Sequence, residues 1–244
     1  MDLQFLGSGD AFGSGGRFNT CIHVANEGGA FLIDCGASSL IAMRKFGVDP
    51  NGIHTVFLSH LHGDHFGGLP FLLLDAQFYS ARRNPLTLVG PPGLRDRLAL
   101  AMEVFFPGSS GAARKFTTEI IEMEAGGTLS VNGVTAVAAL VQHASGAPPF
   151  ALRLACDGKV VAYSGDTEWT EALLPIGRGA DLFIVETLAY ERRIRHHMDY
   201  ASLKMNLGRI GAKRVILTHL GPDMLARLGE LPDEVAEDGR LIHL

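Results

Sequence analysis

Charged residues are scarce in this sequence, and no excess of positive charge offsets the shortage. They make up 19% of the 244 residues, below the roughly 25% of an average soluble protein. The 21 Lys and Arg are outnumbered by 26 Asp and Glu, which gives a formal net charge of −5 with the ten histidines neutral. The chain therefore lacks the general basic surface that long nucleic acids require, and an anionic substrate has to be attracted by local positive charge.

Long apolar runs and paired cysteines are also missing. The longest apolar stretches, such as 134–141, fall far short of the roughly 20 residues that span a bilayer, and the first residues lack the basic and apolar regions of a secretory signal. The three cysteines, Cys21, Cys35 and Cys156, are an odd number without paired spacing. These absences argue against a membrane protein or a disulfide framework, and they favour a cytoplasmic protein with buried cysteines.

Glycine and proline divide the chain into short segments rich in Val, Ile, Leu and Phe, which predicts a sheet-rich protein. The predicted strands are 3–6, 20–24, 30–33, 55–59, 86–89, 119–123, 129–131, 134–141, 150–155, 160–164, 182–185 and 215–218. Asn132-Gly133 and Asp157-Gly158 predict two tight hairpins.

Helices are predicted at 38–47 with Ser38 as its cap, at 69–80, at 94–106, and before Gly211, where Leu203, Leu207 and Ile210 follow helical spacing. The hydrophobic fraction of 47% is ample for a buried core. No polar segment separates the two strand-rich groups. We therefore expect the α/β (α+β) class, with two sheets in one domain that covers 1–244.

The strongest chemical pattern is a run of potential metal ligands directly after the apolar segment 55–59. It reads His60-Leu61-His62-Gly63-Asp64-His65, four ligands in six residues. A single tetrahedral ion cannot use all four from so short a loop and keep an open position. Two ions can, with His60 and His62 on one ion and Asp64 and His65 on the other.

Further ligands are expected where later strands end. His143 follows 134–141, Asp166 follows 160–164, and His219 follows 215–218. Taken singly, each of these residues is more often a turn Asp or a strand-end His. Loops at one edge of a sheet sandwich lie together, so the three side chains together are candidates to complete a dinuclear site.

These motifs resemble those of the metallo-β-lactamase superfamily of hydrolases, in the branch of tRNase Z and related phosphodiesterases. The similarity extends over nearly the whole chain. Besides the histidine motif it includes Leu6-Gly7-Ser8-Gly9-Asp10-Ala11 with Arg17, Leu32-Ile33-Asp34-Cys35-Gly36, Gly90-Pro91-Pro92-Gly93, Ser164-Gly165-Asp166-Thr167 and Leu217-Thr218-His219.

The resemblance implies an αββα sandwich of two mixed sheets flanked by helices, the metallo-β-lactamase fold. It assigns His60, His62 and His143 to one metal ion, Asp64, His65 and His219 to the other, and Asp166 as a bridge. Zinc is the expected metal, although manganese or iron also suits His and carboxylate ligands.

The resemblance also implies a catalytic pair, Glu186 and His197, with His196 as an adjacent competitor. In the expected two-metal mechanism a bridging hydroxide, oriented by Asp64, attacks phosphorus, and His197 backed by Glu186 protonates the leaving oxygen. Arg192, Arg193 and Arg195 precede His197 and are weak candidates for binding phosphate oxygens, since such a run is more often a solvated loop.

Two departures from the tRNase Z pattern weaken a role in tRNA processing. The long arm that grips tRNA between the third metal His and the bridging Asp is absent, because His143 and Asp166 are only 23 positions apart. Asp199, close after His197, would repel a phosphate if it faced the site. The preferred prediction is therefore hydrolysis of a small anionic phosphodiester of the cyclic phosphate or cyclic nucleotide type.

Other interpretations stay open. One alternative is a tRNA 3′-end processing endoribonuclease, although RNA is disfavoured as a partner. Others are a lactone or thioester hydrolase, a redox di-iron protein, or a metal-binding module without turnover. No membrane partner is expected, and a homodimer is left open.

Overall fold

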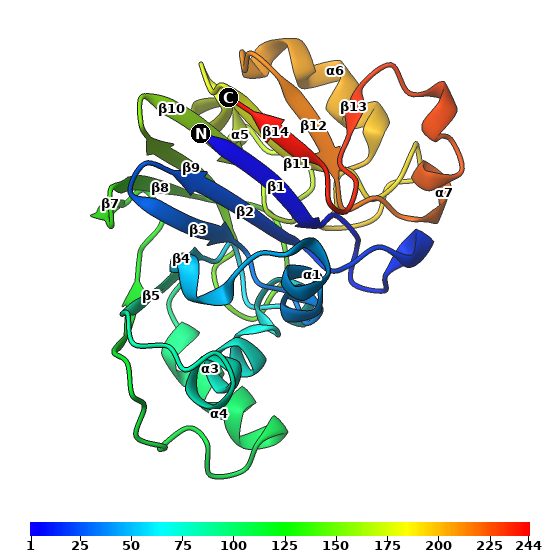
Figure 1. Ribbon diagram of the computed structural model, residues 1–244. Helices are drawn as coiled ribbons and strands as arrows, with labels where there is room; N and C mark the ends of the chain where they lie inside the picture. Colours follow the sequence, from blue (N-terminus) through cyan, green and yellow to red (C-terminus); the bar gives the residue numbers. More distant parts are fainter.

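The computed structural model describes all 244 residues and shows two seven-stranded β-sheets packed face to face (Figure 1). The strands of the first sheet are β1 (Asp2–Gly7), β2 (Cys21–Asn26), β3 (Gly29–Ile33), β4 (Ile53–Phe57), β5 (Leu86–Gly90), β6 (Thr118–Glu122) and β14 (Leu241–His243). Those of the second are β7 (Thr128–Val131), β8 (Val134–Leu140), β9 (Phe150–Cys156), β10 (Lys159–Tyr163), β11 (Leu182–Glu186), β12 (Val215–Thr218) and β13 (Glu234–Val235).

Each sheet is mixed, with an antiparallel part and a parallel part. The first has the order β14-β1-β2-β3-β4-β5-β6 and the second β13-β12-β11-β10-β9-β8-β7. The two predicted hairpins are confirmed: β7 pairs with β8 and β9 with β10 in antiparallel register. Their turn residues, Asn132-Gly133 and Asp157-Gly158, all have positive φ, as tight hairpin turns require.

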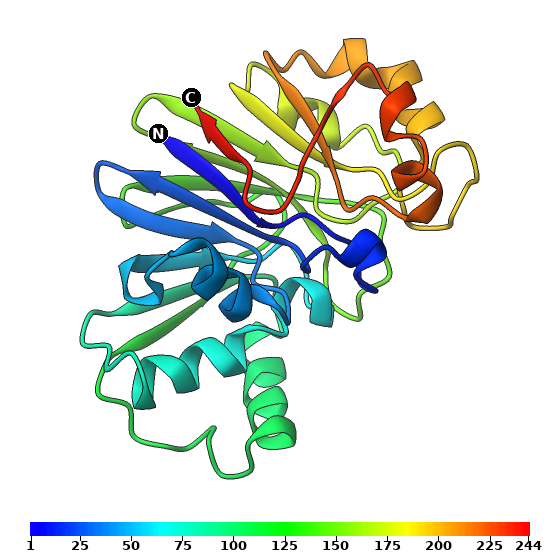
Figure 2. The ribbon, with the colours of Figure 1, turned by 45° about the vertical axis from the view of Figure 1, so that its right-hand side comes forward.

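Helices cover the outer face of each sheet, which confirms the αββα sandwich (Figures 1 and 2). They are α1 (Ser39–Phe46), α2 (Gly63–Phe66), α3 (Leu69–Phe78), α4 (Leu94–Phe105), α5 (Leu173–Gly177), α6 (Tyr200–Ile210) and α7 (Pro222–Leu225), with short 3₁₀ turns at Ser14–Gly16, Pro50–Gly52 and Leu228–Glu230. None of these helices is long and apolar enough to cross a membrane.

Three apolar clusters correspond to the three interfaces between the four layers. The central one joins inward side chains of both sheets, among them Phe5, Phe57, Phe150 and Tyr163. The second lies between the first sheet and α1, α3 and α4, and the third between the second sheet and α5 and α6. The three cysteines are buried and unpaired, as expected from their number and spacing.

Some predicted details are wrong. The Ser38 side chain does not cap α1; its hydroxyl accepts a hydrogen bond from Asn19 N (2.7 Å) and so ties the long loop after β1 to the start of the helix. Helices α2, α5 and α7 and strands β13 and β14 were not predicted. They have two to five residues, too few for an apolar period to show in the sequence.

Candidate metal and catalytic site

The sequence-predicted ligands lie together at one edge of the sandwich. Strands β8, β10 and β12 run in the same direction in the second sheet, so His143, Asp166 and His219 leave the sheet at the same edge. The motif after β4 meets them from the first sheet. It turns at once into α2, a single helical turn that carries Asp64 and His65.

The first group of donors consists of three imidazoles. The rings of His60, His62 and His143 lie with centroids 4.8–5.0 Å apart, and the donor atoms of all three lie within 4.8 Å of one another. His143 is oriented by a hydrogen bond from Nδ1 to the carbonyl oxygen of His196 (3.0 Å). His60 contacts the Ser59 hydroxyl through Nδ1 (3.1 Å), which leaves its Nε2 facing the other two rings.

The second group combines carboxylates and imidazoles: Asp64, His65, Asp166 and His219. Asp64 Oδ2 lies 3.1 Å from His65 Nε2 and 3.2 Å from His219 Nε2. The φ of His219 is 58°, in the left-handed region, and its backbone N–H is held by the carbonyl oxygen of Ser8 (3.0 Å).

Asp166 lies between the two groups. Its Oδ2 is 3.4 Å from His219 Nε2 on one side and 3.9 and 4.0 Å from the Nε2 atoms of His60 and His143 on the other. Its Oδ1 is 3.3 Å from His65 Nε2. A carboxylate in this position is placed to join two sites.

The balance of charge in the cluster favours the binding of additional positive charge. Burial lowers the pKa of His60, His62 and His143, so these imidazoles are neutral. Burial alone would raise the pKa of Asp166, but His219 and His65 hold it well below the usual value. For His65 the directions are reversed. Burial alone would lower its pKa, but the charges of Asp166, Asp64 and Asp34 raise it. Protons on the second group thus compensate buried carboxylates, and a metal cation can take their place.

The residues present fit divalent cations. His60 Nε2, His65 Nε2 and Asp166 Oδ1 are buried and point into the cluster, and none of them makes a well-directed hydrogen bond, although His65 Nε2 and Asp166 Oδ1 lie 3.3 Å apart. Leaving such atoms unsatisfied is costly unless they bind a ligand. Imidazole nitrogen and carboxylate oxygen are donors that zinc, manganese and iron all accept.

The sequence-based list of site residues missed one carboxylate that supports the cluster. Asp34 is fully buried and accepts hydrogen bonds from Ser59 N (2.7 Å) and Ser59 Oγ (2.8 Å), and it contacts His65 Nδ1 at 2.7 Å. This contact fixes the ring of His65 with Nε2 toward the cluster. The motif Leu32 to Gly36 contained Asp34, but its partners lie 25 and 31 positions later and cannot be found from spacing.

Replacing Asp34 with asparagine should weaken metal binding by about 10- to 100-fold, the usual effect of changing a residue that orients a metal ligand. Asn is tolerated at the φ of 58° found here, so the backbone can stay in place. Metal affinity is measured by competition with a chelator, and Asp2→Asn, the same change at an exposed surface carboxylate, is the control. Equal affinity in Asp34→Asn and the wild type would contradict this role.

Glu186 and His197 form the pair that the sequence predicted. Glu186 Oε1 contacts His197 Nδ1 directly, and Glu186 Oε2 accepts hydrogen bonds from Thr167 N (2.6 Å) and Met198 N (3.3 Å). Burial, and then the charge of Asp166, raise the pKa of Glu186. Nε2 of His197 makes no hydrogen bond within the protein, and Nδ1 also lies 4.0 Å from Asp166 Oδ2.

The residues close to His197 in the sequence do not join the groups of possible metal ligands. His196 contributes its carbonyl oxygen to His143, while its own side chain stands apart from the donor groups. Asp199 accepts a hydrogen bond from Ser202 N (2.8 Å) and caps α6. Arg193 and Arg195 line a cavity that His197 also lines, and Arg192 does not.

A cavity of about 220 Å³ opens directly above the donors. Asp64, Asp166, His197 and His219 form its floor and wall, and Phe12, 94% exposed, stands at its rim. The Asp10 carboxylate fixes the Phe12 loop by accepting hydrogen bonds from Phe12 N (3.2 Å) and Ser14 N (2.8 Å). Possible metal ligands, an imidazole bound to a carboxylate and a small cavity thus lie together at one edge of the fold.

Comparisons with known proteins identify similar chains. The family model described as Anti-Pycsar protein Apyc1 matches residues 1–233. Ribonuclease Z of Geobacillus kaustophilus is 27% identical over 90% of this chain and 88% of its own length, and zinc phosphodiesterase ELAC protein 1 of Mus musculus is 38% identical over 43% of this chain and 30% of its own. The crystal structure of human tRNase Z, short form, superposes with a TM-score of 0.81 and 25% identity, covering 100% of this chain and 99% of that one.

Proposed function

The chain belongs to the family described as Anti-Pycsar protein Apyc1, within the tRNase Z-like branch of the metallo-β-lactamase superfamily, and we propose that this metal-dependent hydrolase cleaves a small phosphodiester. The proposal assigns His60, His62 and His143 to one divalent cation and Asp64, His65 and His219 to a second, with Asp166 between them. Zinc is the proposed metal, in line with the name of the mouse relative. Cations bound there would lower the pKa of water and neutralise charge on the phosphoryl oxygens.

The residues of the chain supply orientation and a proton. The carboxylate of Asp64 accepts a hydrogen bond from the attacking water and aims it at phosphorus. The water releases one proton to solvent and its oxygen bonds to phosphorus while the bond from phosphorus to the alcohol oxygen breaks. His197 donates a proton from Nε2 to that departing oxygen, and Glu186 holds the imidazole through Nδ1.

One observation carries the proposal of a small substrate: the cavity above the donors measures only about 220 Å³. This volume lies below the roughly 300–1,000 Å³ typical of small-molecule sites, so the cavity itself accepts the phosphodiester group, and the groups attached to it must extend beyond this cavity. The chain between His143 and Asp166 adds no arm, because it is used by β9, β10 and their two-residue turn within the second sheet.

A second candidate is endonucleolytic processing of tRNA 3′ ends, and the names of the curated relatives favour it. The alignment with the Geobacillus enzyme runs over 278 positions, however, more than the 244 residues of this chain. That relative therefore carries residues with no counterpart here. The two candidates differ in how much substrate the protein must hold, which an activity comparison can test.

We expect the metal-loaded protein to cleave bis(p-nitrophenyl) phosphate and cyclic nucleotides, with a higher kcat/KM for cyclic nucleotides than for a precursor tRNA with a 3′ trailer. A chromogenic lactone and nitrocefin serve as controls for the alternatives on the same fold. Preferred cleavage of the precursor at its 3′ end would establish the second candidate instead.

A further inference from the structure

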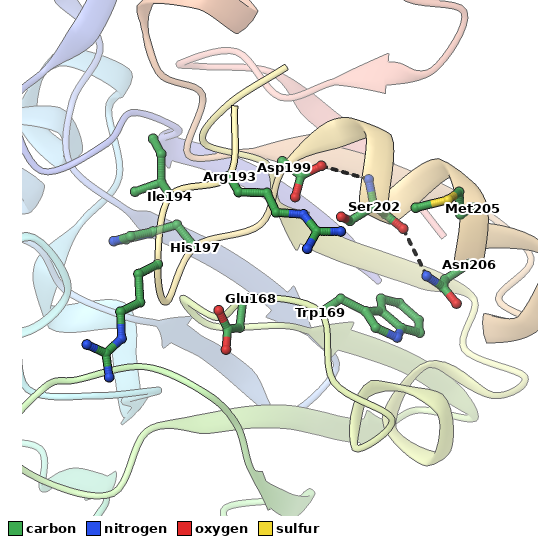
Figure 3. Close-up of a pocket in the computed structure, with 10 residues that line it drawn as sticks. Glu168, Trp169, Arg193, Ile194, His197, Asp199, Ser202, Met205 and Asn206 are labelled. Atoms are coloured by element: carbon green, nitrogen blue, oxygen red, sulfur yellow. Dashed lines mark hydrogen bonds between the residues drawn. The ribbon is translucent and has the colours of Figure 1, made fainter. Parts of the chain in front are cut away.

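A second cavity adjoins the one above the metal donors, and His197 lies on the wall of both. Its volume of about 430 Å³ is within the range of small-molecule sites. The loop after β10 and the segment that leads into α6 form its walls (Figure 3). A third cavity of about 450 Å³ shares Ala11 and Asp64 with the metal cavity but not His197. Of these two neighbours of the metal cavity, the second is lined by His197 and the third is not.

The charges that line this cavity cancel. Arg193 and Arg195 form no ion pair or hydrogen bond within the protein, and Glu168 and Asp199 line the same space. Figure 3 shows the Arg193 side chain extending between Asp199 and Ser202 on one side and Glu168 and Trp169 on the other. Two guanidinium groups and two carboxylates balance each other, so beyond His197, on the wall shared with the metal cavity, no excess positive charge attracts a second phosphate. An uncharged group with hydrogen-bond donors and acceptors matches them better.

Trp169 gives the cavity a flat, firmly supported wall. The guanidinium carbon of Arg209 lies 5.9 Å from the ring centroid of Trp169, and Arg209 is fixed by Glu171 (Nη1 to Oε1, 2.9 Å) and by Asn206 (Nη1 to Oδ1, 2.7 Å). Arg209 does not line the cavity, so it supports the indole from outside. An indole held in this way can stack against a planar ring.

We propose that this cavity is a subsite for the part of the substrate attached to the leaving oxygen, and that it takes a nucleoside whose base stacks on Trp169. In a cyclic nucleotide this part stays bound to phosphorus through the second ester oxygen. The proposal rests on the proposed function and deepens it. The leaving oxygen sits at His197, so the group attached to that oxygen extends past His197 into the cavity. Arg193 offers hydrogen-bond donors and Glu168 acceptors for the edge of the base, as such side chains do in nucleic-acid recognition.

Trp169 is the only tryptophan of the chain, so its fluorescence tests the proposal on the unmodified protein. A nucleoside monophosphate, the product of cyclic nucleotide cleavage, should quench the fluorescence of the metal-loaded protein, whereas ribose 5-phosphate should not. Excitation at the long-wavelength edge of the indole band avoids absorption by the base. No quenching at nucleotide concentrations that inhibit turnover would overturn the proposal.

Kinetics provide the second test. Trp169→Ala should raise KM for a 3′,5′-cyclic nucleotide by about 5- to 100-fold, the effect of losing one stacked base, with kcat nearly unchanged. The KM for the cyclic phosphate of 1,3-propanediol, which has no base, should not change, and Trp169→Phe should restore most of the loss. Tyr79→Ala is the control, since Tyr79 is an exposed ring 5.1 Å from a guanidinium carbon and outside both cavities.

The outcomes separate the two claims. Equal effects of Trp169→Ala on both cyclic phosphates would overturn the subsite and leave the proposed function standing. Failure of the wild-type protein to cleave bis(p-nitrophenyl) phosphate or any cyclic phosphate would overturn both.

Discussion

Replacing Asp166 with alanine is expected to abolish turnover and to lower the metal content of the purified protein. Asp166 lies within 4.0 Å of donors from both groups, through His60 and His143 on one side and His65 and His219 on the other. Its removal leaves His65 and His219, whose pKa values it raises, without this carboxylate, and it removes the link between the two proposed cation sites. Changes that only orient a ligand cost about 10- to 100-fold, so we expect a loss of at least about a thousandfold here.

Metal analysis and the rate with bis(p-nitrophenyl) phosphate measure this effect, and His62→Ala should behave similarly. Asp181→Ala is the matched control. Asp181 lies just before β11, at the opposite end of the strand that carries Glu186, and it is bound by Val160 N and Lys213. Its loss should leave metal content and rate nearly unchanged. Full metal content together with full activity in Asp166→Ala would refute the proposed arrangement.

Removal of the metal should be reversible. Treatment with a chelator is expected to stop turnover, and adding zinc should restore it, because the unsatisfied buried atoms His60 Nε2, His65 Nε2 and Asp166 Oδ1 remain in place in the folded chain. The sequence had already predicted these three residues as metal ligands.

The pattern of the sequence predicted the strands of the central sandwich because each buries an apolar face of several residues. It did not predict β13 and β14. Strand β14 has three residues and pairs with β1 at the other end of the chain, Leu3 against Ile242. A contact across nearly the whole chain leaves no periodicity in the three residues that make it.

The donors were predictable because each follows an apolar strand, and strand ends of the same direction meet at one edge. The residues that orient the donors were not. Asp34 reaches His65 across 31 positions, and Ser8 holds His219 from the other end of the chain while its own side chain is held by Asp238. Such partners depend on how the two sheets pack, which no local spacing records.

The sequence also did not indicate which charged residues lie beside the arginines. The run Arg192 to Arg195 was a weak candidate for binding phosphate on charge alone. The structure places Arg193 and Arg195 in a cavity with Glu168 and Asp199, and this balance of charge favours a neutral base over a phosphate as the bound group.

His197→Ala should lower kcat for a cyclic nucleotide by about 10²- to 10⁴-fold and keep its metal, because His197 supplies a proton and is not one of the proposed ligands. The loss should be much smaller for bis(p-nitrophenyl) phosphate, whose leaving phenol is acidic and departs without a proton. This dependence on the leaving group distinguishes a general acid from a residue that merely maintains the site.

His196→Asn is the matched control for this experiment. His196 has a φ of 68°, which Asn tolerates, and its contribution to the site is the backbone carbonyl that orients His143. We therefore expect nearly normal activity from it.

His197 also belongs to a third group of possible donors with Asp166, Glu186 and His219, so loss of metal in His197→Ala would mean that His197 is a ligand. An equal loss of activity with both substrates would likewise contradict the general-acid role. A large loss confined to the cyclic nucleotide, with the metal retained, is the result that the contact of Glu186 with His197 Nδ1 predicts, because it leaves Nε2 free to protonate the leaving oxygen.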